Sequence, residues 1–242
     1  MIKNTEFNTC PLVFHAPGHF IHNPAWELIT QIKQSPHVDC DQLDIITWNS
    51  SEPTERLIHN GKTLGIFEKS IPHLKHTVLG KNSVNWTNRE KINLTVNHLQ
   101  QSTFKYTLGA DSGDAIMIGE PTEILNRFLK MDCDLLFNAD MNCWPFDPEI
   151  RDFEEQVATS TFKYLNAGVW IGETTFCLDF FKETQKIIND TSILPEWSEQ
   201  ALLKKTYKKL YPKVKLDHNC EIFQVLNGLP PDMIVKRTIK LM

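Results

Sequence analysis

The stretch that decides the fold runs Phe104-Lys105-Tyr106-Thr107-Leu108-Gly109-Ala110 and continues as Asp111-Ser112-Gly113-Asp114. The apolar part predicts a short buried strand, and the acidic part follows at its carboxyl end. Two carboxylates three residues apart can turn toward one point, where they repel each other unless a cation lies between them. Hard oxygen ligands of this kind suit Mg²⁺ or Mn²⁺, and such an ion suits a nucleotide diphosphate. A plain solvated turn is the alternative, because Asp and Gly are common in turns.

Strands and helices alternate along the rest of the chain. Apolar runs typical of strands cover residues 10–14, 43–48, 64–67, 76–80, 115–118, 134–139, 164–172, 214–216 and 221–223, and helical spacing covers 26–32, 88–101, 120–130, 176–188 and 198–210. This alternation predicts an α/β fold with a largely parallel sheet and flanking helices. Ligands of such folds gather at the carboxyl ends of strands, and Asn49, Asp111 and Asp140 follow three of them.

Composition narrows the class of protein. The 242 residues are 41% hydrophobic and 23% charged, which is ordinary for a globular protein and predicts one domain over residues 1–242. A net charge of -5 argues against wrapping nucleic acid. No apolar run approaches the about 20 residues that span a bilayer, and residues 1–6 lack an apolar signal core. We therefore expect a cytoplasmic protein without a membrane partner.

The six cysteines predict no metal cluster of their own. They are Cys10, Cys40, Cys133, Cys143, Cys177 and Cys220. A zinc site would need tighter local spacing, and no Cys-x-x-Cys pair occurs. Reduced, partly buried thiols are favoured over disulfides.

An ordered series of motifs resembles a known family. Residues 108–117 (Leu-Gly-Ala-Asp-Ser-Gly-Asp-Ala-Ile-Met) are followed by Leu135-Leu136-Phe137-Asn138-Ala139-Asp140, Cys143-Trp144-Pro145, residues 164–172, Ser198-Glu199-Gln200, and residues 216–228. The series, from about residue 43 to 228, resembles the glycosyltransferase domain of the procollagen lysyl hydroxylases. The resemblance implies a GT-A fold, a Mn²⁺-dependent sugar transferase and a UDP-sugar donor.

One departure from the family concerns the third metal ligand. The family carries it in a His-Gly-Asn-Gly segment near the end of the domain, which this chain lacks. Residues 11–18 (Pro-Leu-Val-Phe-His-Ala-Pro-Gly) resemble that segment, displaced to the N-terminus. We therefore expect a circular permutation, with residues 1–36 as the displaced strand and helix, because domain termini often lie close together. His15 would join Asp111 and Asp114 as metal ligand; His19 and His22 are close rivals, and His218 is a weaker one.

The resemblance also implies a donor site. Thr47 and Asn49, at the end of the first strand of the nucleotide-binding half, would lie near the uracil and ribose. Lys91 would offset diphosphate charge, and Ser112 and Trp144 are assigned to the donor pocket. Asn166 and Gly168 match a family turn that lines the donor site, where small residues allow close approach of backbone to ligand. For each of these residues a purely structural role is the alternative.

Catalysis rests on two carboxylates in this interpretation. Glu199 stands where the family has the last of a run of aspartates. In an inverting transfer it could act as general base toward an acceptor hydroxyl; in a retaining transfer it would instead position substrate or stabilise an oxocarbenium-like centre. Ser198 to Gln200 are equally typical of a plain helix start. Asp140 would bind hydroxyl groups of the sugar.

The function expected from the sequence is a glycosyltransferase that uses Mn²⁺ or Mg²⁺ to move glucose or galactose from a UDP-sugar to an unknown hydroxyl on a protein, glycan or small molecule. Two alternatives stay open. One is a nucleotidyltransferase or sugar-nucleotide hydrolase with the same metal site. The other is a UDP-binding domain without catalysis.

Overall fold

The structure is a computed structural model that describes residues 2–18, 29, 37–50, 58–59, 62–63, 65–81, 83, 86–226 and 239–241, of which 58–59, 62–63 and 239–241 are described as backbone only. The helix expected over 26–32 lies outside these residues except for Ile29. His19 and His22 lie outside them as well.

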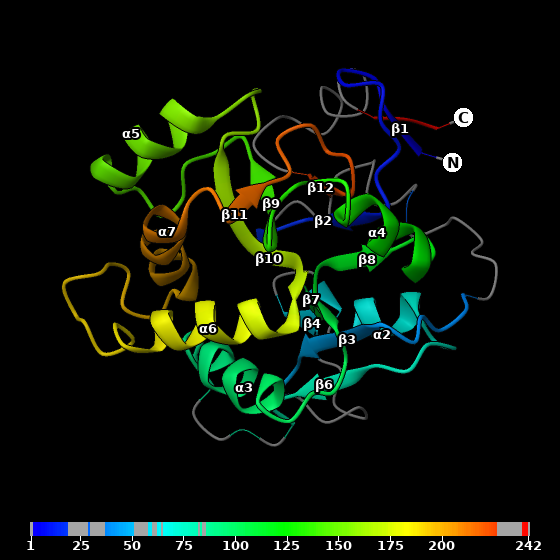
Figure 1. The fold of residues 1–242 in the computed structure, drawn as a ribbon, viewed down its shortest axis with the longest axis horizontal. Coiled ribbons are helices and arrows are strands. Elements are labelled where there is room, and N and C mark those ends of the chain that lie inside the picture. The colour runs from blue at the N-terminus through cyan, green and yellow to red at the C-terminus, as the bar shows by residue number, and fades with distance from the viewer. Residues whose placement is uncertain are drawn as a thin grey trace.

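A six-stranded mixed sheet forms the centre of the molecule (Figure 1). Its order is β11 (Val214–Leu216), β9 (Leu135–Asp140), β10 (Tyr164–Glu173), β7 (Tyr106–Asp111), β3 (Leu43–Trp48) and β6 (Thr77–Leu79). Only β10 runs antiparallel to its neighbours; the other pairs in this sheet are parallel. This arrangement confirms the predicted α/β class with a GT-A-type, Rossmann-like sheet.

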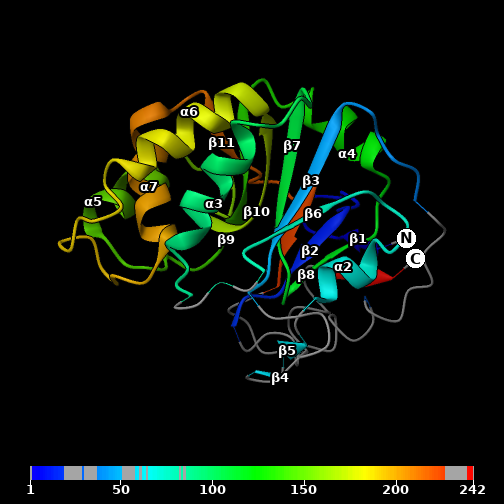
Figure 2. The same ribbon diagram turned by 90° about the horizontal axis from the view of Figure 1, so that it is seen from below.

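Three helices cover one face of this sheet (Figure 2). They are α3 (Glu90–Leu99), α6 (Thr174–Gln185) and α7 (Glu199–Leu210), and α5 (Pro148–Val157) packs on the outside of α7. The core between helices and sheet is aromatic, with Trp170, Phe180 and Tyr207 fully buried. Gly109 of β7 makes room for this core, because a Cβ there would come within 2.5 Å of the Trp170 ring.

The other face of the sheet carries two short helices and a second sheet. The helices are α2 (Ile66–Ser70) and α4 (Pro121–Phe128), and the strands, in order, are β12 (Phe223–Val225), β2 (Val13–His15) and β8 (Ala115–Met117). β2 is the middle strand, parallel to β12 and antiparallel to β8. An N-terminal segment is thus built into the sheet between strands from the centre and the end of the chain.

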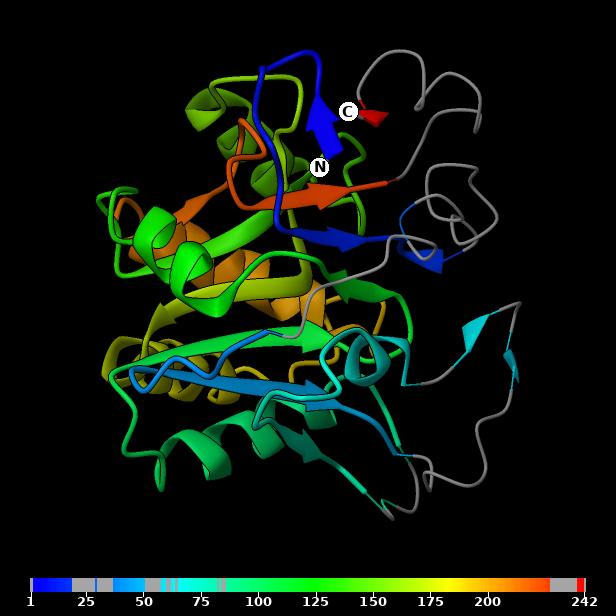
Figure 3. The same cartoon turned by 90° about the vertical axis from the view of Figure 1, so that its right-hand side faces the viewer.

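The two described ends of the chain lie side by side (Figure 3). β1 (Ile2–Asn4) pairs antiparallel with β13 (Ile239–Leu241), and Ile2 faces Leu241. A separate two-stranded sheet joins β4 (Ile58–His59) and β5 (Lys62–Thr63).

The structure corrects several expected elements. Residues 66 and 67, expected in a strand, begin α2 after Gly65, whose φ is 74°. The last strand of the second sheet begins at Phe223 instead of Glu221, because the Asp217 carboxylate accepts the backbone N–H groups of residues 221–223 and holds them in a turn. The strand expected over 10–14 lies at 13–15, as β2. Helix α5 was not predicted; it begins at Pro148 with Asp147 as its cap.

All six cysteines are free thiols in the structure. Among the described residues, no helix combines the length and the apolar character needed to cross a membrane.

Candidate metal and donor site

A cavity of about 590 Å³ opens where the carboxyl ends of β7 and β9 meet the last residue of β2. Most of the predicted site residues line it. The lining comprises His15, Pro17, Gly18, Asn88, Lys91, Asp111, Asp114, Asp140, Asn142, Cys143, Trp144, Asn166, Ala167, Gly168, Trp197, Glu199 and Gln200. They come from segments that lie far apart in the sequence, between residues 15 and 200, so the fold creates the cavity.

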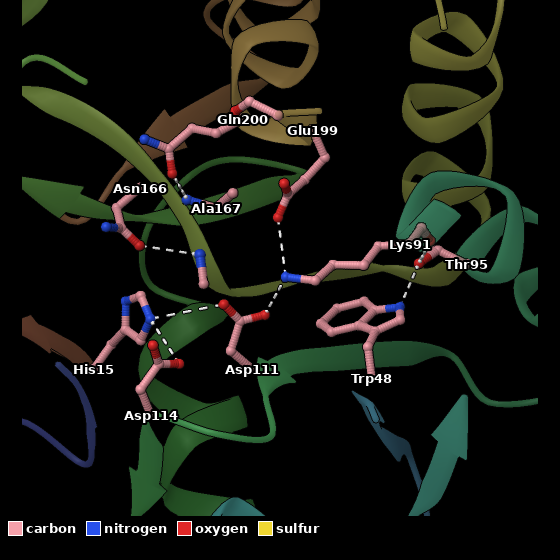
Figure 4. Close-up of polar contacts among 12 residues, drawn as sticks. His15, Trp48, Lys91, Thr95, Asp111, Asp114, Asn166, Ala167, Glu199 and Gln200 are labelled. Atoms are coloured by element: carbon pink, nitrogen blue, oxygen red, sulfur yellow. Dashed lines mark hydrogen bonds and ion pairs between the residues drawn. The ribbon is translucent and has the colours of Figure 1, made fainter. Parts of the chain in front are cut away.

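Among these lining residues, His15, Asp111 and Asp114 point toward one another (Figure 4). The Nε2 atom of His15 lies 3.3 Å from Asp114 Oδ1 and 3.7 Å from Asp111 Oδ2. One potential ligand atom from each side chain falls within 4.8 Å of the others. The strand register fixes this geometry, because His15 on β2 pairs with Ala115 on β8, directly after Asp114.

The chemistry of these three side chains fits a divalent cation. His15 is 3% exposed, and neither of its ring nitrogens has a hydrogen-bond partner. Leaving a buried polar group without a partner costs about 1–3 kcal/mol, which a metal–nitrogen bond would offset. Two carboxylates and one imidazole form a donor set that Mn²⁺ accepts well.

Gly168 on β10 makes room for the imidazole. A Cβ at this position would overlap the ring of His15. The place of His15 therefore depends on β10 as well as on β2.

Lys91 joins the Asp111 carboxylate of the proposed metal site to the Glu199 carboxylate at the start of α7. Its Nζ lies 2.7 Å from Asp111 Oδ1 and 3.0 Å from Glu199 Oε1, and 5.8 Å from the Trp48 ring centroid. Burial would lower the pKa of Lys91, but the Asp111 and Glu199 carboxylates outweigh it and raise that pKa, so the ammonium stays charged. Burial raises the pKa of Glu199, with the Lys91 charge opposing the shift. Lys91 thus places a fixed positive charge between the two carboxylates.

A hydrogen-bond network shapes the wall formed by β9 and β10. Asn166 accepts from the Gly168 backbone N–H at 3.0 Å, and its Nδ2 donates to Asp140 Oδ2 at 3.2 Å. Asp140 Oδ1 accepts from the Asn142 backbone N–H at 2.7 Å. The register of β10 against β9 shifts between Asn166 and Trp170. This bulge turns the polar side chains of the wall toward one another.

Three predicted donor residues lie away from the cavity wall. Thr47 is fully buried, and its hydroxyl has no partner. Asn49 donates to Glu68 at 3.3 Å, and Ser112 donates to the same carboxylate at 2.9 Å. None of the three lines the cavity formed by the described residues. Their contact with the nucleotide stays a prediction.

Gln200 and Trp197 are among the lining residues that the sequence reasoning did not assign to the site. Gln200 accepts the Ala167 backbone N–H at 2.8 Å and donates to the Trp144 carbonyl, which ties α7 to β10 and to the loop after β9. Trp197 packs against Trp144 with ring centroids 5.5 Å apart. Neither contact leaves a local signal in the sequence.

His218 is held elsewhere. Its Nδ1 lies 2.6 Å from the Phe162 carbonyl oxygen, and it lines a different cavity beside Tyr207. Among the described histidines, His15 is the one grouped with Asp111 and Asp114.

The chain is similar to a known family of glycosyltransferase domains. The family model described as "PLOD GT domain" matches residues 58–240. The human multifunctional procollagen lysine hydroxylase and glycosyltransferase LH3 is 28% identical over 182 residues, which cover 72% of this chain and 22% of LH3. Human procollagen-lysine,2-oxoglutarate 5-dioxygenase 2 is 30% identical over 127 residues, 51% of this chain and 16% of that protein. An uncharacterised protein, R699, of Acanthamoeba polyphaga mimivirus is 28% identical over 135 residues, 55% of this chain and 27% of R699.

The chain therefore spans about a fifth of the length of the first of these relatives. The matched family region begins after residue 57, so His15 lies outside it.

The predicted cytoplasmic location is wrong. The procollagen-modifying relatives are enzymes of the secretory pathway, in the lumen of the endoplasmic reticulum. The prediction rested on the lack of an apolar run in residues 1–6, and that absence carries no information about the compartment.

The family match and the relatives identify the class of enzyme. The matched region includes Asp111, Asp114, Asp140 and Glu199, and the relative LH3 is itself named as a glycosyltransferase. The chain is a glycosyltransferase, and it belongs to the family of PLOD glycosyltransferase domains.

Proposed function

We propose that this glycosyltransferase moves a hexose, glucose or galactose, from a UDP-sugar to a hydroxyl acceptor, with Mn²⁺ or Mg²⁺ held by His15, Asp111 and Asp114. The observation that carries the proposal is the convergence of a buried imidazole without hydrogen-bond partners on two carboxylates. A ligand set of one imidazole nitrogen and carboxylate oxygens favours Mn²⁺, because Mg²⁺ prefers oxygen ligands.

The bound ion would act as a Lewis acid that neutralises charge on the departing UDP. Lys91 supplies a second positive charge beside it, 2.7 Å from Asp111. When a donor diphosphate enters, the ammonium group can turn from the carboxylates to a phosphate oxygen. Positive charge held beside the departing diphosphate stabilises the transition state.

Glu199 is proposed as the general base of an inverting transfer. It takes the proton of the acceptor hydroxyl while that oxygen bonds to the anomeric carbon. The bond between the anomeric carbon and the phosphate oxygen breaks, and UDP leaves with its electron pair. The raised pKa of Glu199 suits proton transfer, since the best general base has a pKa near the working pH.

The wall of β9 and β10 is proposed to hold the donor sugar. Asp140 and Asn166 present polar atoms to the cavity, and Trp144 lies at its rim.

We further propose that His15 occupies its place through a circular permutation. Support comes from the position of β2 between β12 and β8, and from the pairing of Ile2 with Leu241. A strand that entered this sheet from the C-terminal end could reach the same place.

Calorimetric titration with Mn²⁺ and UDP tests the metal site. We expect the intact protein to bind UDP only with Mn²⁺ present, and Asp111→Ala, Asp114→Ala and His15→Ala to weaken that binding by at least tenfold, about 1.4 kcal/mol. Asp39→Ala is the matched control, because Asp39 contacts Lys75 on the exposed surface. Unchanged affinity in all three site variants would refute the proposed ligand set.

A donor screen tests the sugar. Saturating UDP-glucose or UDP-galactose with Mn²⁺ should stabilise the fold by about 2.7 kcal/mol when the ligand stands at a hundred times its Kd. The stabilisation should vanish when a chelator removes the ion. No stabilisation by any UDP-sugar would reject this donor class.

A further inference from the structure

Arg89, the residue before α3, is a buried cation outside the proposed metal and donor site. It is 9% exposed and does not line the cavity that the described residues form. Its guanidinium group donates to the backbone carbonyl oxygens of Ile188 and Ile193, each at 2.7 Å. A longer contact of 3.5 Å reaches the Asp190 carbonyl. A buried charge is costly unless hydrogen-bond acceptors surround it, so these carbonyl groups stabilise Arg89 in its place.

The three carbonyl groups belong to the segment of residues 186–198, which joins α6 to α7. Residues 189–192 of this segment are exposed. The Asp190 carboxylate accepts the Ser192 backbone N–H at 2.9 Å, and the Ser198 backbone N–H donates to the Pro195 carbonyl at 2.9 Å. These bonds lie within the segment. Arg89 instead joins the segment to another element, α3.

An arginine suits this contact better than a lysine. Nη1 of Arg89 contacts the Ile188 carbonyl, and Nη2 contacts the Ile193 carbonyl. The planar guanidinium group presents its donors in a fixed fork, whereas lysine carries a single ammonium group. Ile188 also lies just beyond the C-terminus of α6, where the helix dipole favours a cation. Arg89 therefore holds the end of α6 and a second point of the segment at once.

Arg89 connects the starts of the two helices that carry Lys91 and Glu199. Lys91 lies in the first turn of α3, directly after Arg89 and Glu90, and Glu199 begins α7 at the end of the segment. Lys91 Nζ and Glu199 Oε1 lie 3.0 Å apart (Figure 4). The same two parts of the chain are thus joined twice, by this ion pair and by the bonds from Arg89 to the backbone.

We propose that Arg89 is a positioning residue of the transferase, which holds the segment before α7 against the start of α3 and so sets the place of Glu199 relative to Lys91. The inference rests on the proposed roles of Glu199 and Lys91. Without Arg89, Lys91 keeps its bond to Asp111, but the segment can move away from α3 and shift the Glu199 carboxylate. A displacement of about 1 Å in a catalytic group can lower the rate by on the order of 10²-fold.

Arg89→Lys and Arg89→Gln test the proposal on the intact protein. The measured reaction is the Mn²⁺-dependent release of UDP from UDP-glucose and UDP-galactose, with water as the acceptor. We expect kcat to fall by about tenfold or more in both variants, because neither side chain offers two nitrogen donors in a fork. The affinity for UDP with Mn²⁺ should stay within about threefold of the natural value, since the proposed metal ligands and Lys91 stay in place.

Arg151→Gln is the matched control, because Arg151 pairs with Asp152 on the surface of α5. It should release UDP at the natural rate. A natural kcat in both Arg89 variants would overturn the proposal.

A double-mutant cycle with Glu199→Gln separates positioning from a purely structural role. If Arg89 acts through Glu199, then Arg89→Lys should slow UDP release by less than about twofold when Glu199→Gln is already present, because the effects of interacting residues are not additive. A loss of the same size with and without Glu199→Gln would also overturn the proposal.

Amide hydrogen exchange gives a measurement that needs no turnover. In Arg89→Lys, exchange should become at least about threefold faster in residues 186–198 and at the start of α3. Helix α4, on the other face of the sheet, is the internal reference and should exchange at its natural rate. Unchanged exchange in both segments would contradict the proposal. A natural chain that releases no UDP from either donor would instead refute the proposed function, and the exchange rates would still decide whether Arg89 holds the two segments together.

Discussion

At the scale of single residues, Gly168 decides whether His15 can occupy the metal site. An added methyl group would overlap the imidazole. Gly168→Ala should therefore displace the ring and weaken Mn²⁺ binding by at least tenfold, about 1.4 kcal/mol. Calorimetric titration with Mn²⁺ measures the effect.

Gly172→Ala is the control for this prediction, because Gly172 is also tightly packed and lies on the same strand. Its added Cβ would meet Cys177 Sγ at 2.5 Å and the Asp134 carbonyl at 2.8 Å, far from the three proposed ligands. It should lower stability by about 1–3 kcal/mol through overpacking and leave the Mn²⁺ affinity of the folded protein unchanged. Equal Mn²⁺ affinities for Gly168→Ala and the natural chain would contradict our placement of the ligand.

A second prediction at this scale concerns Glu199. Glu199→Gln should leave UDP binding intact and slow sugar transfer by about 10²–10⁴-fold, the usual contribution of a general base. Glu196→Gln, three residues earlier and exposed, should transfer at the natural rate. Turnover and UDP affinity measured on both variants decide the role, and normal turnover of Glu199→Gln would remove it.

The site residues differ in how far the sequence could reveal them. Asp111 and Asp114 lie within three residues of each other after an apolar run, so their proximity is a local property. His15 is nearly a hundred residues away and was assigned only through the family resemblance. The partners of Gln200 and Trp197 depend on how loops meet in space, which no local pattern encodes.

At the scale of secondary-structure elements, a buried ion pair joins α5 and α7. Lys204 is 1% exposed, and its Nζ lies 3.0 Å from Glu154 Oε2; Glu154 also accepts the Leu165 backbone N–H at the start of β10. Lys204→Met should cost about 3–5 kcal/mol, because it leaves a buried carboxylate without its counter-charge. Lys208→Met, one turn later in an exposed pair with Glu149, should cost at most about 1 kcal/mol.

The loss of folding stability caused by Lys204→Met should depend on pH. Burial already raises the pKa of Glu154 from its usual 4.5, and loss of the opposing Lys204 charge raises it further. A carboxyl whose pKa is higher in the folded than in the unfolded protein favours folding at low pH, and this benefit is lost as pH rises through the folded value. Urea unfolding should therefore show a smaller deficit at about pH 5 than at about pH 8. An equal loss of stability at the two pH values would contradict the explanation that Glu154 is left with an unpaired charge.

Strands that are buried along almost their whole length were predicted correctly from the sequence. β7, β9 and β10 are apolar runs buried nearly throughout, so the sequence pattern predicts them closely. α5 was missed because its face is mostly charged and only Ile150 and Glu154 are buried. The shift of β12 follows from the three backbone bonds to Asp217, a contact of side chain with backbone that apolar patterning does not report.

At the scale of the whole molecule, the first residues complete both the fold and the proposed site. β2 fills the space between β12 and β8 and brings His15 to the carboxylates after β7. Without it, two strands would each expose an unpaired edge, which is costly and promotes aggregation. The N-terminal segment therefore has a structural role whether or not the metal is bound.

The order of segments along the chain can be changed to test the proposed permutation. Ile2 faces Leu241 in an antiparallel pair, so a short Gly-Ser linker can join residue 242 to residue 1. A chain that begins after Gly18 and carries residues 1–18 behind this linker should fold and bind Mn²⁺ within about tenfold of the natural affinity, because the reordering leaves every contact of His15 in place. The same reordered chain with His15→Ala is the control and should fold without binding the ion. Circular dichroism and a cooperative thermal transition show whether the reordered chain folds. If it folds but binds Mn²⁺ no better than its His15→Ala control, the metal site depends on the present order of segments.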